Sequence, residues 1–192
     1  MALAVENSDI ELAKSASETL IVRAVFGAGM ASQRKDNSNV VKGIRACVGM
    51  IRNSHNYNED TTFDFVPFKF DGYDRKPSSF YVRFLMEGIE YEYSFSMTKH
   101  EILTEQMYYY PNGRKSLVFS RDESKGTDKR CVYDFKPLLK RPMDVAANTS
   151  RKTLFISRAS TRGHPNRLFF RFSTIVSWFC TYGLIDCRQF YL

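Results

Sequence analysis

The middle of the chain alternates apolar and polar side chains with the two-residue period of β-strands. Every second residue is apolar over 80–86 and again over 89–97, and the pair Glu87–Gly88 between them is a tight-turn signal. The Pro111–Gly113 tripeptide marks a second turn. The pattern predicts an antiparallel meander with one apolar and one largely polar face. Its expected strands are 67–70, 80–86, 89–97, 102–110, 116–120 and 131–135.

Before the meander, a short apolar run and a helical stripe flank a glycine-containing loop. Leu20–Phe26 is rich in β-branched and aromatic residues, and its nearly continuous apolar character predicts a strand covered on both faces. Asn37 or Ser38 can cap a following helix. The apolar side chains of that helix recur at helical spacing from Val40 to Ile51, and a polar run over 53–60 predicts its end.

After residue 136 the periodicity becomes helical. Helices are expected over 137–148, with an interruption at Pro142, over 153–160 and over 168–182. The last is the most apolar stretch, but its polar side chains predict a buried helix and not a membrane span. We therefore expect a single domain. Its regions are a polar lead-in (1–19), a strand, loop and helix (20–60), an antiparallel β region (61–135) and a helical, basic end (136–192).

The composition is that of a folded domain with a basic C-terminal end. Of the 192 residues 43% are hydrophobic and 15% aromatic, which argues against global disorder. The net charge is +7, and residues 151–192 carry seven basic side chains against one acid, Asp186. A basic end can bind nucleic acid or a phosphate-bearing partner, although a solvated basic face is the simpler interpretation.

The cysteines and histidines show no metal-binding or catalytic spacing. None of the four cysteines forms a CxxC pair, and the three histidines lie far from them and lack a Ser or Cys partner at a motif spacing. We expect four reduced, mostly buried thiols and a cytoplasmic protein without a membrane partner. The cysteines are Cys47, Cys131, Cys180 and Cys187, and the histidines are His55, His100 and His164.

Three further groups of polar residues have both a functional and a structural interpretation. Glu87, Glu90 and Glu92 lie on the polar face of the predicted hairpin, where we expect them to be solvated. Asp60 and Asp64 can bind a cation, but a plain loop is the favoured interpretation. The run Tyr108–Tyr110 can stack nucleobases, although half-buried strand positions are more usual for such residues.

The loop after Phe26 carries the candidate chemistry. A glycine loop between a strand and a helix binds phosphate because loop N–H groups and the helix N-terminus face the anion, and a lysine adds charge. Gly29 and Lys35 have the spacing of the first Gly and the Lys in GxxxxGK[ST], but Arg34 and Asp36 replace the second Gly and the Ser/Thr. In an alternative register Ser38 supplies the hydroxyl, and the lysine then comes three residues too early.

This stretch resembles the strand, loop and helix of AAA family ATPases whose nucleotide-binding core is related to ABC, SMC and RecF ATPases. Members of this family include phage-defence and abortive-infection proteins, with a loop like YGANASGKSN and a helix like NLLKAIRF. The matching residues here are Phe26–Ala28, Ala31–Ser32 and Ser38–Arg45. The similarity continues through FDFVPFKF, SSFYVRFLMEGIEYEYSFSMTKHEIL, MYYYPNGRKSLVF and TLFISRAS, and so covers about residues 20–165.

The resemblance implies an α/β, P-loop NTPase-like fold of the ABC/SMC type, with the antiparallel meander and C-terminal helices, as an incomplete domain. It implies that ATP and Mg²⁺ bind at the loop, whose candidate residues are Gly27, Gly29, Lys35, Ser38 and Asn39. It also implies a partner, either a homodimer or the missing ATPase half, which would carry the signature motif and the catalytic acid of the Walker B strand.

The departures from the family pattern concern activity. QRKDN at residues 33–37 stands in place of GK, and the family's opening strand and distal half are not recognised. We therefore expect little or no ATP hydrolysis by this chain alone, and no catalytic residue is assigned. Two other hypotheses stay open. One is an interaction module that binds no nucleotide and uses the meander and the basic end. The other is a nucleic-acid binder that uses the basic residues between Arg151 and Arg171.

Overall fold

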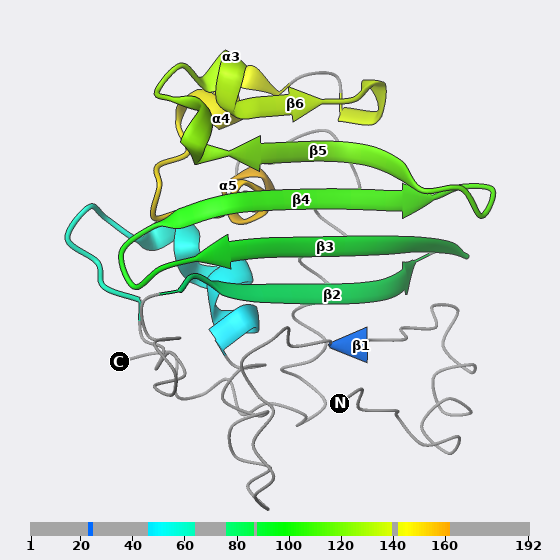
Figure 1. Ribbon diagram of the computed structural model, residues 1–192, viewed down its shortest axis with the longest axis horizontal. Coiled ribbons are helices and arrows are strands. Elements are labelled where there is room, and N and C mark those ends of the chain that lie inside the picture. Colours follow the sequence, from blue (N-terminus) through cyan, green and yellow to red (C-terminus); the bar gives the residue numbers. More distant parts are fainter. Residues whose placement is uncertain (1–22, 25–45, 64–75, 87, 140–141, 162–192) are drawn as a thin grey trace, which may run out of the picture.

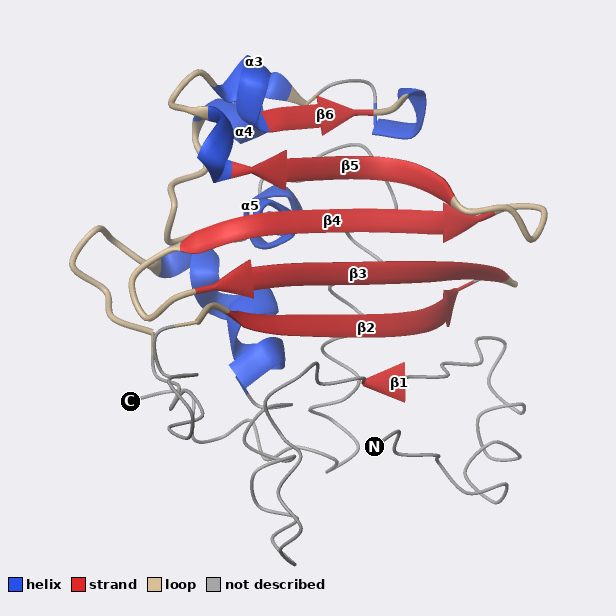
Figure 2. Cartoon of the chain, in the orientation of Figure 1, coloured by secondary structure: helices blue, strands red, loops and turns tan. Residues whose placement is uncertain are grey.

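One antiparallel sheet dominates the computed structural model, which describes residues 23–24, 46–63, 76–86, 88–139 and 142–161 (Figure 1). Its six strands lie in chain order, β1-β2-β3-β4-β5-β6, and each pairs antiparallel with the next (Figure 2). The strands are β1 (Arg23–Ala24), β2 (Ser78–Met86), β3 (Ile89–Met97), β4 (Ile102–Tyr110), β5 (Ser116–Asp122) and β6 (Tyr133–Phe135). The predicted meander is thus confirmed from residue 78 to 135, whereas the expected strand at 67–70 lies outside the described residues.

The turns of the meander lie where the sequence predicts them. Gly88 has φ +75° between β2 and β3, and Gly113 has φ +72° between β4 and β5. Glycine is favoured at both positions because a Cβ destabilises this left-handed region of backbone conformation. The first turn pairs Met86 with Ile89 and Phe80 with Phe95, so the apolar positions of the two strands share one face.

Helical segments cover that apolar face of the sheet. Figure 1 shows α5 and the helix of residues 46–53 on the same side, behind the strands. The helix of residues 46–53 presents Cys47, Val48, Met50 and Ile51 to the core. The remaining helical elements are η1 (Ser54–Asn56), η3 (Glu123–Lys125), α3 (Lys129–Val132), η4 (Pro137–Leu139), α4 (Met143–Ala147) and α5 (Phe155–Thr161).

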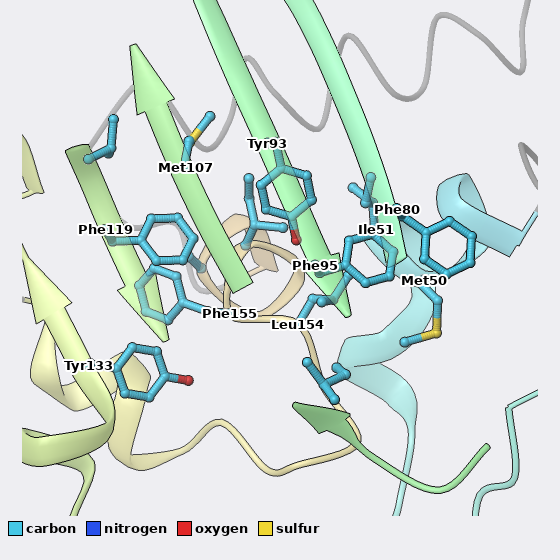
Figure 3. Close-up of a cluster of buried hydrophobic side chains, with 14 of the residues drawn as sticks. Met50, Ile51, Phe80, Tyr93, Phe95, Met107, Phe119, Tyr133, Leu154 and Phe155 are labelled. Carbon is cyan, nitrogen blue, oxygen red and sulfur yellow. The ribbon is translucent and has the colours of Figure 1, made fainter. Parts of the chain in front are cut away.

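Aromatic side chains fill the space between the sheet and these helices (Figure 3). The rings of Phe80 and Phe95 stack across β2 and β3, with centroids 4.8 Å apart. On the other side of the core, Phe155 of α5 packs against Phe119 with ring centroids 4.9 Å apart. Burying one such side chain completely contributes about 1.5–3 kcal/mol. Burial of Phe155 therefore holds α5 against the strands, and a helix of only seven residues would not be stable without such packing.

Several boundaries differ from the sequence-based prediction, since β2 begins at Ser78 and not at residue 80, and β5 ends at Asp122 and not at residue 120. Residues 131–135, expected as a strand, begin inside α3 and become β6 only at Tyr133. The reason is local, since the Asp128 side chain accepts a hydrogen bond from the Arg130 N–H and starts one helical turn. The helix expected from residue 153 begins at Phe155. The interruption at Pro142 is confirmed, because η4 ends at Leu139 and α4 begins at Met143.

The coarse fold class, helices packed with an antiparallel sheet, agrees with the prediction. The expected strand at residues 20–26 is described only at Arg23–Ala24, which pairs with Arg83 and Val82 at the edge of the sheet. Residues 25–45 lie outside the described chain, so the P-loop arrangement stays a prediction. The same is true of the helix at 168–182 and of the lead-in. No helix within the described ranges is long and apolar enough to cross a bilayer.

Candidate functional site

The candidate phosphate-binding residues Gly27, Gly29, Lys35, Ser38 and Asn39 all lie outside the described residues. What the structure describes is the chain on either side of them. On the N-terminal side β1 joins the sheet edge, and on the C-terminal side the helix of residues 46–53 packs into the core. That helix leads into η1, where Ser54 is completely buried. Both flanks of the predicted loop are therefore attached to one body.

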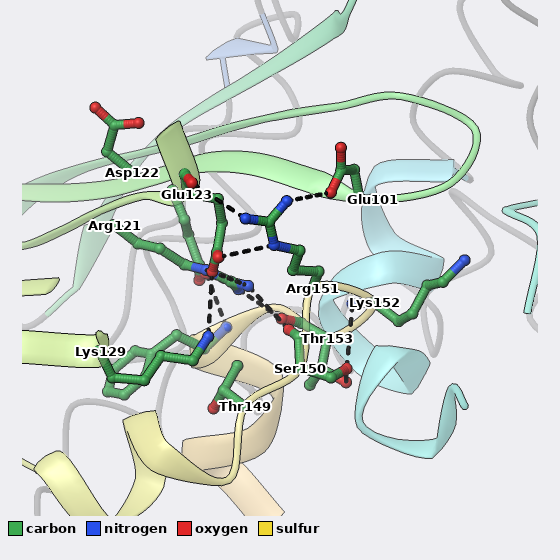
Figure 4. Close-up of polar contacts among 12 residues, drawn as sticks. Glu101, Arg121, Asp122, Glu123, Lys129, Thr149, Ser150, Arg151, Lys152 and Thr153 are labelled. Carbon is green, nitrogen blue, oxygen red and sulfur yellow. Dashed lines mark hydrogen bonds and ion pairs between the residues drawn. The ribbon is translucent and has the colours of Figure 1, made fainter. Parts of the chain in front are cut away.

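A buried ion cluster lies under the sheet, close to the end of this helix. We use this name for the buried Glu105, Arg121 and Glu123 and for the two cations that reach Glu123 from the surface, Lys129 and Arg151. Figure 4 labels all of these residues except Glu105. Glu105 on β4 and Arg121 on β5 are paired across the strands, and both side chains are fully buried. Their nearest charged atoms, Glu105 Oε2 and Arg121 Nη1, are 3.6 Å apart. Sequence reasoning missed this pair. Each residue lies two positions from an apolar residue of its strand, Met107 or Phe119, and therefore faces the core on the same side of the sheet.

The Glu105 carboxylate holds the beginning of α5. It accepts hydrogen bonds from the backbone N–H groups of Phe155 (2.8 Å) and Ile156 (3.1 Å), and from the Tyr93 hydroxyl (2.9 Å). Burial raises the pKa of Glu105, and the Arg121 charge and these three donors oppose that shift. The first N–H groups of a helix have no partner within the helix, so a buried helix start needs such an acceptor. This contact explains why α5 begins at Phe155.

Arg121 uses the rest of its donors on the chain that leads into α5. Its Nη1 donates to the Thr153 carbonyl (2.7 Å) and its Nη2 to the Ser150 carbonyl (2.9 Å). Its Nε donates to Glu123, which also pairs with Arg151 (3.2 Å). A buried charge is tolerated only when it is paired and hydrogen-bonded, and this network meets both conditions. The cluster therefore holds the backbone before α5 in place. Its contacts leave neither Glu105 nor Arg121 available to react with a substrate.

A histidine–serine contact joins the same elements. His55 Nδ1 lies 3.2 Å from Ser157 Oγ, and the His55 backbone N–H donates to the same oxygen at 3.1 Å. The sequence showed no partner for His55 because the two residues are 102 positions apart. Burial and the nearby Arg158 charge lower the pKa of His55. Ser157 is only 2% exposed, so its hydroxyl is closed to a substrate and the contact ties η1 to α5.

The polar face of the sheet carries a second charge cluster, and it corrects one expectation. Glu92, expected to be solvated, is 7% exposed and accepts hydrogen bonds from Tyr110 (2.7 Å) and Lys115. Burial alone would raise the pKa of Glu92, but these donors outweigh it and the pKa is lowered. Glu90 is ion-paired with Arg83, and Glu87 lies outside the described residues. Glu90 and Glu92 thus each have a cationic partner.

The three consecutive tyrosines take the half-buried strand positions that the favoured interpretation predicts. Tyr109 faces the core, where its ring lies 6.3 Å from that of Tyr91. The Lys115 ammonium stands 4.3 Å from the centroid of the Tyr108 ring, and the Arg83 guanidinium stands 5.3 Å from that of Tyr110. These two rings already interact with cations of the same chain, which weakens the nucleobase-stacking hypothesis.

The remaining candidates are consistent with structural roles. Within the described ranges, no group of three or more His, Cys, Asp or Glu side chains is placed to hold a metal ion. Asp60 is exposed, and Asp64 lies outside those ranges. Cys47 is buried, as expected for most of the thiols, and burial raises the pKa of its thiol to about 12, whereas Cys131 is exposed. Cys180 and Cys187 are not described.

The first basic residues of the C-terminal end, Arg151 and Lys152, bind to other parts of the same chain. Arg151 pairs with Glu101 at 2.8 Å and with Glu123, and the Lys152 ammonium donates to the Thr61 carbonyl at 2.7 Å. Lys152 is only 8% exposed. Lys152 is therefore not part of a solvated basic face, whereas the Arg151 side chain is ion-paired but still 43% exposed. The basic residues from Arg162 to Arg188 lie outside the described chain, so the nucleic-acid hypothesis stays untested there.

Comparison with models of known protein families, with curated proteins and with solved structures finds no match for this chain.

Proposed function

We propose that the chain is part of a nucleotide-binding domain of the AAA family ATPases related to ABC, SMC and RecF proteins. In this proposal the loop between β1 and the helix of residues 46–53 binds the phosphates of ATP together with Mg²⁺. The contacts would come from Gly27, Gly29, Lys35, Ser38 and Asn39. The resemblance assigns the catalytic acid to a distal half, so the chain alone is expected to bind nucleotide with little or no turnover.

The observation that supports this proposal is the order and anchoring of the elements around the loop. A strand at the sheet edge precedes residues 25–45, and a helix with four buried side chains follows them. A phosphate loop works by holding backbone N–H groups at fixed positions, which requires both of its ends to be held. The altered residues Arg34 and Asp36 weaken the motif, so affinity has to be measured and is not inferred from the pattern.

Calorimetric titration with Mg-ATP tests the proposal, and Lys35→Ala is the informative variant. We expect micromolar binding by the wild-type chain and at least about a tenfold loss of affinity in Lys35→Ala, because a lysine supplies point charge to the phosphates. Lys99→Ala is the matched control, since Lys99 is an exposed lysine in the turn between β3 and β4. Its affinity for ATP should equal that of the wild type.

Two results would overturn the proposal. The first is no heat from the wild-type chain at millimolar nucleotide. The second is binding that Lys35→Ala and Lys99→Ala weaken equally, which would indicate a general charge effect. The first result would favour the interaction module that binds no nucleotide.

A further inference from the structure

Residues 150–157, which we call the connecting segment, lie between the sheet and the end of the helix of residues 46–53. We call this helix the loop helix because it follows the candidate loop. Residues 152–157 of the segment are buried, and Thr153, Leu154, Phe155 and Ile156 have no exposed surface at all, whereas Arg151 is exposed. It follows α4 in the chain and runs into α5. Figure 4 shows its first residues between the ion cluster and the helix of residues 46–53. The sequence pattern predicts a helix within this segment, but neither that pattern nor the proposed function assigns the segment a coupling role.

One side of the connecting segment is bonded to the end of the loop helix. The Thr153 hydroxyl donates to the Ser54 carbonyl (2.9 Å), and the Leu154 N–H donates to Ser54 Oγ (3.0 Å). Ser157 Oγ accepts from His55, and Lys152 Nζ donates to the Thr61 carbonyl. All four contacts link positions at least 91 apart in sequence. They therefore join two separate parts of the chain and do not belong to a local turn.

The other side of the same segment is bonded to the sheet. Arg121 holds the Ser150 and Thr153 carbonyls, and Glu105 holds the N–H groups of Phe155 and Ile156. The Ile102 N–H at the start of β4 donates to the Arg151 carbonyl (2.8 Å). Thr153 is the residue where both sides meet, because its hydroxyl bonds η1 while its carbonyl bonds β5.

From these contacts we infer that the connecting segment couples the helix after the candidate loop to α5, with Thr153 and Ser54 as the coupling residues. A disturbance at the end of the loop helix changes the Ser54 contacts. Because the segment is held on its far side by charged, buried partners, the change passes along it into α5. The coupling itself does not depend on the proposed function. Only the identification of nucleotide as the ligand that uses the coupling rests on it.

Hydrogen exchange followed by mass spectrometry tests the coupling without nucleotide. In Thr153→Val, which keeps the shape and removes the hydroxyl, we expect peptides covering both 51–57 and 155–161 to exchange about tenfold faster. Ser54→Ala makes the same test from the other element and should speed exchange in 155–161 as well. Peptides from β3 and β4 serve as the internal reference and should be unchanged.

Thr149→Val is the matched control for this experiment. Thr149 is 2% exposed, and its hydroxyl donates to the Val145 carbonyl at 2.7 Å, within the same helical segment. Its replacement should speed exchange around α4 without changing residues 51–57. The inference is overturned if Thr153→Val and Ser54→Ala each affect only their own element, or if they speed exchange equally across the sheet. The second pattern would show general destabilisation.

A second arm adds millimolar Mg-ATP to the wild type and to Thr153→Val. The coupling predicts slower exchange in 155–161 of the wild type on binding, and no such change in Thr153→Val although ATP still binds. Binding that leaves 155–161 of the wild type unchanged would show that nucleotide does not use this coupling, and it would overturn that part of the inference. If the wild type does not bind ATP, the proposed function fails, while the exchange results without nucleotide still decide the coupling.

Discussion

Replacing Arg121 by methionine is expected to lower the free energy of unfolding by about 3–5 kcal/mol, the usual cost of removing one partner from a buried ion pair. Arg121 has no exposed surface, and its donors satisfy Glu123 and the carbonyls of Ser150 and Thr153. Methionine fills much of the volume but removes the donor of the Ser150 and Thr153 carbonyls and the cation beside the buried Glu105 carboxylate. Urea unfolding measures the change, and we expect a lower midpoint concentration of urea with an unchanged dependence of the free energy of unfolding on urea.

Arg83→Met is the comparison for this prediction, because it removes an ion pair of the same kind from the surface. The side chains of Arg83 and Glu90 are each 38% exposed, and such pairs contribute about 0–1 kcal/mol. A loss in Arg121→Met no larger than in Arg83→Met would contradict the assigned role of the buried ion cluster. The double variant Glu105→Gln/Arg121→Met should cost less than the sum of the two single variants, since the two residues contact each other within one ion network.

Replacing Phe155 by alanine is expected to cost a similar amount, about 3–5 kcal/mol, as is usual when a buried aromatic side chain is truncated. Phe155 has no exposed surface, and its ring centroid lies 4.9 Å from that of Phe119, 5.2 Å from Phe135 and 5.5 Å from Tyr133. Alanine would leave a cavity at the point where α5 meets β5 and β6. For a chain of this size the melting temperature should fall by about 10 °C.

Two further variants separate this cavity effect from a general effect of losing apolar surface. Phe155→Leu keeps most of the volume and should cost clearly less than alanine. Leu138→Ala removes a large side chain that is 40% exposed, and it should change stability by about 1 kcal/mol or less. Equal losses in Phe155→Ala and Leu138→Ala would show that α5 is not held to the sheet in the way described.

The strands and turns of the meander were predictable because their signals are local. Alternation places Phe80 and Phe95 on one face whatever the rest of the chain does, and Gly88 and Gly113 occur where a positive φ is needed. The α3 turn was missed because one side chain, Asp128, shifts the balance towards a helix over four residues. Apolar periodicity does not register a single cap of this kind.

The candidate phosphate loop is the opposite case, since the sequence is the source of every statement about Gly27, Gly29, Lys35, Ser38 and Asn39. The described structure contributes the anchoring of the loop's two flanks. For the polar residues the sequence was a poor guide. Glu92 looks like a surface residue in the alternation, yet cross-strand neighbours bury it among Tyr110 and Lys115.

The sequence pattern, which did not place β1 in this sheet, was enough to predict the order of β2 to β6, their antiparallel turns and the apolar face that becomes the core. These follow from backbone geometry and from periodicity over a few residues. Only the tertiary structure decided that Glu105 and Arg121 form a buried pair and that residues 150–157 bond to both η1 and the sheet. The contacts to η1 join residues 99 and 100 positions apart, and the stability of the buried pair comes from burial, which no local pattern specifies.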